Sequence, residues 1–273
     1  MDFLEEEVLP ELITQKDLGK LESGIVKLRK TFGENFGYEH DFKSVEMPES
    51  EIENIVKIVK EQSGYEYYLE NRERLFRENG IEDKLTDDSQ IKIFFDEPLI
   101  KHVEAGEDET KYHLNIKLGK PEIILEKTTE HEIIAMYGHE YTHHTQAVSA
   151  LDVLSLVRNP DENEMEKNHG IFRALREGQA LSMEQSIAKI YAEKNQDPNY
   201  YLHILVNCLS SMSKVYNLIN SSDNKNEFAF KKRDEPLRDG EIGLTYFMLN
   251  DLKPKDYYKE FIERFVNRNS LGE

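Results

Sequence analysis

The chain has 273 residues, of which 38% are hydrophobic and 33% are charged. These proportions are typical of a globular protein with enough chain for one large or two modest domains. The formal net charge of -19 would repel a nucleic-acid backbone or an anionic membrane surface, so neither is expected as a partner.

The N-terminal segment MDFLEEEVLPEL is acidic and lacks the basic flank and apolar stretch of a signal peptide. No later run approaches the roughly 18 apolar residues that a membrane span needs. Cys208 is the only cysteine, so no disulfide can form within the chain, and a reducing compartment is acceptable. Together these features predict a cytoplasmic protein without a membrane partner.

Residues 1–89 are predicted to form a mainly helical region of unknown role. After short helical pieces, Ser50 and Glu53 have the spacing of a capping box at the start of a longer helical unit, and Gly80 suits its end. Four apolar residues within this unit recur at helical spacing and predict a buried stripe: Ile52, Ile55, Val56 and Val59.

The pattern changes to strands between Ile91 and Leu125. Three segments, IKIFF, YHLNIKL and EIIL, are separated by residues that favour turns. Polar and apolar residues alternate in the second segment, which predicts a sheet with one wet face or an exposed edge.

A helix is predicted from Thr129 to Val148, in TEHEIIAMYGHEYTHHTQAV. Thr129 and Glu132 have the spacing of a capping box, and apolar residues recur at helical spacing. Side chains four positions apart project from one face of a helix, so His139 and His143 offer two imidazoles to a tetrahedral zinc ion. Neither His131 nor His144 shares that face at one-turn spacing.

Glu140 lies beside these two histidines but points about 100° away from His139 around the helix. It is therefore placed to reach a water on the metal and not to join the ligand pair. A catalytic zinc site also needs a third protein ligand, and its fourth position stays open for water. A second helix, predicted from Ile171 to Ala192 after an acidic loop that extends to Asn168, supplies Glu177.

HEYTH followed downstream by Glu177-Gly178-Gln179-Ala180 resembles the gluzincin metallopeptidases, whose third zinc ligand is often the Glu of E-G-x-A on a second helix. The resemblance covers about a third of the chain, from Ile91 to Gln185. Metzincins would need Gly and His closely after the second His, where this chain has Gln146, Ala147 and Val148. That family is excluded.

The resemblance implies an α+β fold with a zincin-like core of small mixed sheet, metal-binding helix and glutamate helix. This core would lie in a domain of residues 90–273 with a helical C-terminal part. It also implies one zinc ion per chain, held by His139, His143 and Glu177. The expected activity is hydrolysis of a peptide or protein substrate, with Glu140 as the general base.

Further roles follow from the same resemblance. Gluzincins bind the peptide along the edge strand beside the metal helix, a role expected here for Tyr112 to Leu118. Tyr246 is the favoured donor to the oxyanion, with His203 and His169 as other candidates. Thermolysin-like members have an Asp one turn after the third ligand, where this chain has Leu181.

The residues that orient the ligating imidazoles must therefore come from elsewhere. Glu184 or a backbone carbonyl can accept a hydrogen bond from a ligating histidine, and Gln146 and Thr142 lie close to the motif in sequence. The C-terminal part is predicted to hold a core helix from Asn199 to Asn220, a surface loop from Ser221 to Asp234 and two last helices. These helices are expected at residues 241–252 and 255–267.

Two other functions stay open. Glu140-Tyr141-Thr142-His143 and Glu166-Lys167-Asn168-His169 are two E-x-x-H pairs, as in di-iron carboxylate bundles. Against this function, the second pair lies in a short polar segment and strands precede the first. The zincin-like core can also serve as a catalytically silent binding or regulatory module.

Overall fold

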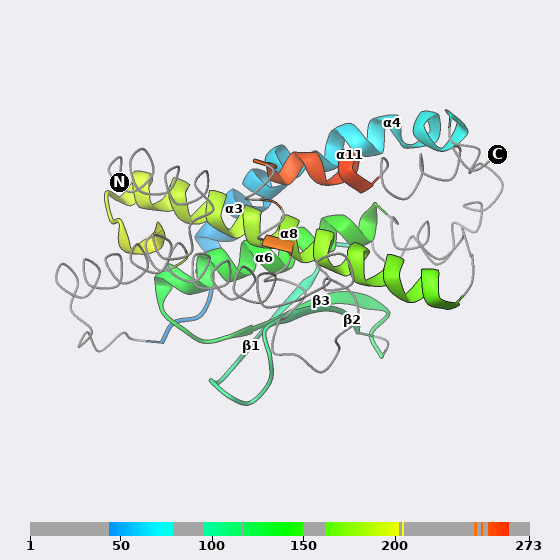
Figure 1. Cartoon of the computed structure of the whole chain (residues 1–273). Helices are drawn as coiled ribbons and strands as arrows, with labels where there is room; N and C mark the ends of the chain where they lie inside the picture. The colour runs from blue at the N-terminus through cyan, green and yellow to red at the C-terminus, as the bar shows by residue number, and fades with distance from the viewer. Residues whose placement is uncertain are drawn as a thin grey trace, which may run out of the picture.

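The computed structural model describes residues 44–78, 96–115, 117–149, 162–201 and 251–261, with single positions at 204, 243, 244 and 247. Within these ranges a small sheet is covered on one face by helices (Figure 1). The predicted mixture of helices and a small mixed sheet is confirmed. No helix among the described residues is long and apolar enough to cross a membrane.

The sheet consists of β1 (Leu99–Val103), β2 (Lys111–Asn115) and β3 (Lys120–Glu126), in the order β1-β3-β2. The central strand β3 runs parallel to β1 and antiparallel to β2. Among the described strands β2 therefore lies at an edge, as predicted, although it ends at Asn115. The sequence did not predict β1, because it follows an acidic Asp-Glu-Pro segment, and IKIFF lies outside the described residues.

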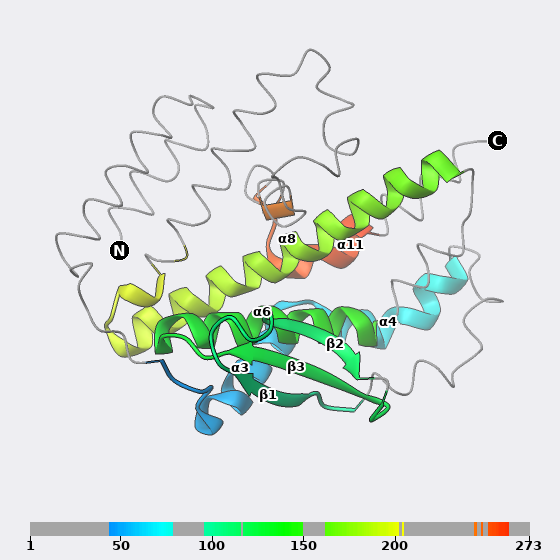
Figure 2. The same cartoon turned by 90° about the horizontal axis from the view of Figure 1, so that it is seen from below.

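Helix α6 (Glu130–Val148) lies along the sheet and carries HEYTH (Figure 2). Thr129 precedes the helix and its Oγ1 accepts a hydrogen bond from the backbone N–H of Glu132, which confirms the predicted start. Ile123 and Leu125 of β3 and Ile133 of α6 are fully buried in one core. The helix that carries HEYTH thus packs against the sheet through this core.

Helix α8 (Glu162–Asn195) packs beside α6 and is 34 residues long. The predicted loop up to Asn168 is wrong, because α8 already begins at Glu162. Negative side chains stabilise the first turns of a helix, and the segment from Glu162 to His169 contains no Gly or Pro. The acidic run is therefore compatible with a helix start.

The predicted longer helical unit is divided into α3 (Glu49–Gln62) and α4 (Tyr65–Glu78). Gly64 joins them at φ +75, and a Cβ there would lie 3.0 Å from the backbone O of Lys255. The predicted capping box at Ser50 is wrong, because α3 begins one residue earlier, after Pro48.

Helix α3 shares its core with α6, the helix that carries HEYTH. Ile55 and Val59 of α3 belong to the same buried cluster as residues of α6 and α8. Tyr68 of α4 stacks on Tyr258 with ring centroids 4.6 Å apart. The boundary at residue 89 stays a prediction, but α3 does not form a core of its own.

The C-terminal part is described only in pieces. A helical segment begins at Asn199, as predicted, and its Tyr200, Tyr201 and Ile204 are buried in the core. Further along lie the short helices η4 (Pro254–Asp256) and α11 (Tyr257–Phe261). Cys208 and the predicted loop 221–234 lie outside the described residues.

Candidate metal centre

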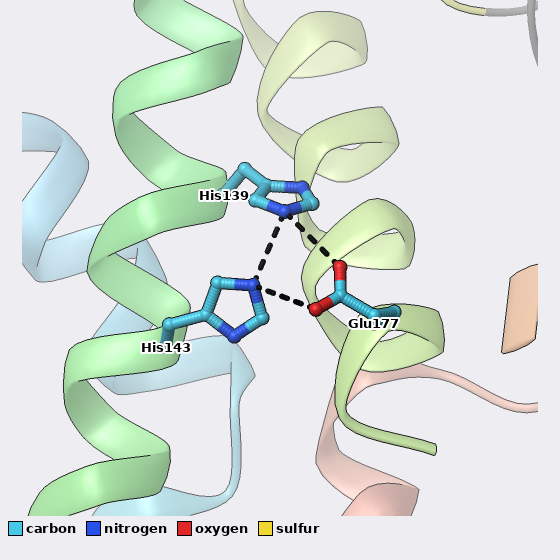
Figure 3. A group of neighbouring side chains, drawn as sticks. All are labelled: His139, His143 and Glu177. Atoms are coloured by element: carbon cyan, nitrogen blue, oxygen red, sulfur yellow. Dashed lines mark hydrogen bonds and ion pairs between the residues drawn. The ribbon is translucent and has the colours of Figure 1, made fainter. Parts of the chain in front are cut away.

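The three predicted ligands meet where α6 and α8 lie side by side (Figure 3). His139 Nε2 lies 3.2 Å from His143 Nε2 and 3.6 Å from Glu177 Oε2. His143 Nε2 lies 3.5 Å from Glu177 Oε1. Two nitrogen or oxygen ligands at the usual 2.0–2.1 Å from a tetrahedral ion lie about 3.3 Å apart. The three atoms therefore have the separations that one metal ion needs.

Close contact between the two helices brings these residues together. Gly138 directly precedes His139, and a Cβ at this position would lie 2.0 Å from Cδ1 of Ile187 on α8. Only a residue without a side chain lets Ile187 occupy this place. Gly138 therefore leaves room for the Ile187 side chain where α8 packs against α6.

The other ring nitrogen of each histidine has a partner that accepts a hydrogen bond. His139 Nδ1 lies 3.1 Å from Glu184 Oε2, and His143 Nδ1 lies 2.7 Å from Gln146 Oε1. Both acceptors were among the residues considered from the sequence. In a neutral imidazole with Nδ1 protonated, Nε2 carries a lone pair. Two lone pairs and a carboxylate then converge on one point, which favours a cation there.

The charges around this point favour a cation for a second reason. Burial opposes protonation of His139, but hydrogen bonds to Glu177 and Glu184 outweigh it and raise its pKa well above the usual 6.5. Burial likewise raises the pKa of Glu177, but its hydrogen bonds from His139 and His143 place that pKa well below the usual range. The centre thus attracts positive charge, whether a proton or a metal ion.

Glu140 is buried, with 7% of its surface exposed, and stands beside the three ligands without belonging to their group. Its negative charge helps to raise the pKa of His139, so it lies close to that ring. No described residue donates a hydrogen bond to its carboxylate.

The remaining histidines of α6 have partners away from the centre. His131 Nε2 lies 2.8 Å from Asp197. His144 Nδ1 lies 3.3 Å from the Tyr112 hydroxyl, and burial lowers its pKa to about 4. Thr142 does not orient a ligand, because its hydroxyl donates to the backbone O of Gly138, one turn earlier.

Two residues of the centre were missed from the sequence. Gln179 accepts a hydrogen bond from Gln146, and Arg176 donates its Nε–H to the side-chain oxygen of Gln146. Gln179 belongs to the E-G-Q-A segment, and its position two residues after Glu177 was the available signal. Its role depends on how the two helices face each other, which the sequence does not show.

The segment proposed for a di-iron site lies too far from the centre. Glu166 and His169 are on α8 and precede Glu177 by 11 and 8 positions. At 1.5 Å per residue these intervals are about 16 and 12 Å along the helix. The sequence analysis placed this pair in a short polar segment and was wrong, because the segment belongs to α8. The distance of the pair from Glu177 along the helix argues against a di-iron site independently. Tyr246 and His203 lie outside the described residues.

Among the described residues, His139, His143 and Glu177 are the one group of His, Cys, Asp or Glu placed to hold a metal ion. Comparisons with protein-family models, with curated proteins and with solved structures yield no match. The donor set and its geometry are therefore the grounds on which a function can be proposed.

Proposed function

We propose that this protein is a zinc-dependent peptidase of the gluzincin kind, with one zinc ion held by His139, His143 and Glu177. The observation that carries the proposal is the convergence of their three ligand atoms within 4.8 Å of one another. Two imidazoles and one carboxylate, with a fourth position open, are a donor set of catalytic zinc.

The reaction would break one peptide bond with one water molecule. Zinc supplies Lewis acidity, which polarises the scissile carbonyl and makes water a better nucleophile at neutral pH. Glu140 would take a proton from the attacking water while the water oxygen bonds to the carbonyl carbon. Glu140 then gives that proton to the departing nitrogen as the C–N bond breaks. The products are a carboxylic acid and an amine, which exchange a proton to become a carboxylate and an ammonium group.

The edge strand β2 suits a peptide substrate. Tyr112 of β2 lies beside His144 of α6, so this strand runs next to the helix that carries the ligands. No other described strand pairs with the outer edge of β2, and an extended peptide could add there through backbone hydrogen bonds. We propose that a peptide or protein substrate binds there, with Tyr246 as donor to the oxyanion.

The test is Glu140→Gln, which keeps the shape of the side chain and removes its basic carboxylate. Zinc should stay bound, and hydrolysis of a mixed peptide library should fall about 10²- to 10⁴-fold, as expected for loss of a general base. Glu193→Gln, an exposed change on α8, is the matched control and should cleave like the wild type.

Zinc is measured in every variant, because a protein without its metal cannot report on the base. A wild type that binds zinc but cleaves no peptide favours the silent binding module. Cleavage by Glu140→Gln at the wild-type rate would contradict the proposed mechanism.

A further inference from the structure

Two buried glutamines connect the metal centre to backbone groups far away in the sequence. Gln146 Oε1 lies 2.7 Å from His143 Nδ1, and Gln146 Nε2 donates to Gln179 Oε1 at 2.7 Å. Gln179 Nε2 in turn donates to the backbone O of Ser63 at 3.2 Å and of Pro254 at 2.9 Å. Both glutamines are fully buried.

The backbone carbonyls at the far end of this series of hydrogen bonds determine which way each amide side chain is turned. A backbone carbonyl can only accept a hydrogen bond, whereas an amide side chain has one donor end and one acceptor end. The carbonyls of Ser63 and Pro254 therefore require the NH₂ group of Gln179, which turns its oxygen toward Gln146. Gln146 must then turn its NH₂ group toward Gln179 and its oxygen toward His143.

Arg176 supports the same direction independently. Its backbone O accepts a hydrogen bond from Gln146 Nε2 at 3.0 Å, and its Nε–H donates to Gln146 Oε1 at 3.2 Å. A flipped Gln146 amide would place a donor against the Nε–H and an acceptor against the carbonyl. Three backbone carbonyls and the Arg176 Nε–H, whose donor or acceptor character cannot change, thus agree on one orientation of the two glutamine amides.

We propose that Gln146 and Gln179 are positioning residues that hold His143 in the tautomer with Nδ1 protonated. This tautomer leaves the Nε2 lone pair for a metal, whereas a flipped Gln146 would favour the opposite tautomer, whose Nε2 is protonated and has no lone pair to offer the centre. The inference rests on the proposed metal centre. It adds that the backbone of Ser63, between α3 and α4, and of Pro254 in η4 helps to determine the tautomer of His143.

The test compares variants that remove an acceptor with variants that keep it. Gln146→Leu removes the oxygen that accepts from His143, while Gln146→Glu keeps an oxygen in that place. Gln179→Leu removes the next acceptor, one hydrogen bond further from His143. Loss of such an orienting partner typically weakens metal binding about 10- to 100-fold.

We expect that loss in Gln146→Leu, and smaller losses in Gln179→Leu and in Gln146→Glu, which keeps the acceptor for His143 but no longer donates to Gln179 and to the backbone O of Arg176. The probe is zinc alone, titrated against a competing chelator, with the absorption spectrum of the cobalt-loaded protein as a second readout. Thr142→Val is the matched control, since this buried hydroxyl next to His143 bonds only the backbone of its own helix in the described structure.

The melting temperature of each metal-free variant separates positioning from stability. A wild type that binds no metal overturns the metal centre and this inference together. If the wild type binds zinc and the Leu variants bind it equally tightly while melting earlier, the glutamines only stabilise the fold. Equal losses in Gln146→Leu and Gln146→Glu would also overturn the inference. Should Gln146→Leu fail to fold, a Gln179→Leu protein that binds zinc as tightly as the wild type would overturn it.

Discussion

Gly178 and Gly243 meet backbone to backbone beside the candidate metal centre. A Cβ at Gly178 would lie 2.7 Å from the backbone O of Gly243, and a Cβ at Gly243 would lie 1.8 Å from the backbone O of Ala174. Because Gly178 directly follows Glu177, this contact fixes the turn of α8 that carries the third ligand. The glycine of E-G-Q-A thus has a packing reason in this fold.

Gly178→Ala should therefore destabilise the protein, although alanine is the better helix former by about 1 kcal/mol. Overpacking against a backbone that cannot yield costs about 1–3 kcal/mol, and displacement of Glu177 should weaken metal binding as well. Urea unfolding and a zinc titration measure the two effects. Ser186→Ala, a half-buried change on the same helix, is the control. A Gly178→Ala protein as stable as the wild type would show that the backbones do not touch.

The metal ligands give a second prediction, of stoichiometry and identity. We expect about one zinc ion per chain, and loss or severe weakening of binding in His139→Ala, His143→Ala and Glu177→Ala. His131→Ala is the control, because this ring pairs with Asp197 away from the centre. Elemental analysis of the purified variants gives the answer. Two metal ions per chain, or iron in place of zinc, would contradict the proposed centre.

A third prediction concerns Glu166 and His169, the other E-x-x-H pair. Both lie on α8 at least two turns before Glu177, so they cannot share an ion with it. The double change of both residues to alanine should leave the metal content of the protein unchanged. A loss of metal in this variant would mean that the assignment of Glu177 is wrong.

Local signals made the helix of the first two ligands predictable. Thr129 caps α6, and i, i+4 spacing alone places His139 and His143 on one face. Whether Glu177 faces them depends on how α6 and α8 pack, for example on the contact between Gly138 and the Ile187 side chain. Such a contact joins residues far apart in the chain, and no periodicity encodes it.

The errors have the same physical origin. The start of α8 was missed because its first turns are polar and show no apolar stripe. Gln179 belongs to the E-G-Q-A motif, but its hydrogen bonds to Gln146 of α6 and to the backbone of Ser63 and Pro254 exist only in the folded chain. Buried hydrogen bonds between distant segments are properties of the folded chain, so the sequence alone predicts which side chains share one face of a helix better than the partners that these side chains find on other segments.

The last prediction concerns Glu184, whose carboxylate lies 3.1 Å from His139 Nδ1. The two ligating histidines have different partners, since His139 faces a carboxylate and His143 faces a neutral amide. A carboxylate makes the imidazole a stronger electron donor to a metal than an amide does, because its charge stabilises the N–H that it accepts. Glu184 should therefore contribute both orientation and charge to the centre.

Two substitutions separate these contributions. Glu184→Gln keeps an oxygen for His139 but loses the charge, so zinc affinity should fall by up to about tenfold, whereas Glu184→Leu removes both and should cost about 10- to 100-fold. Competition with a chelator measures both affinities, and Glu193→Gln on the same helix controls for loss of one negative charge. Equal affinities in Glu184→Gln and Glu184→Leu would show that charge and not orientation is what Glu184 provides. Wild-type affinity in both would mean that His139 binds its metal without help from Glu184.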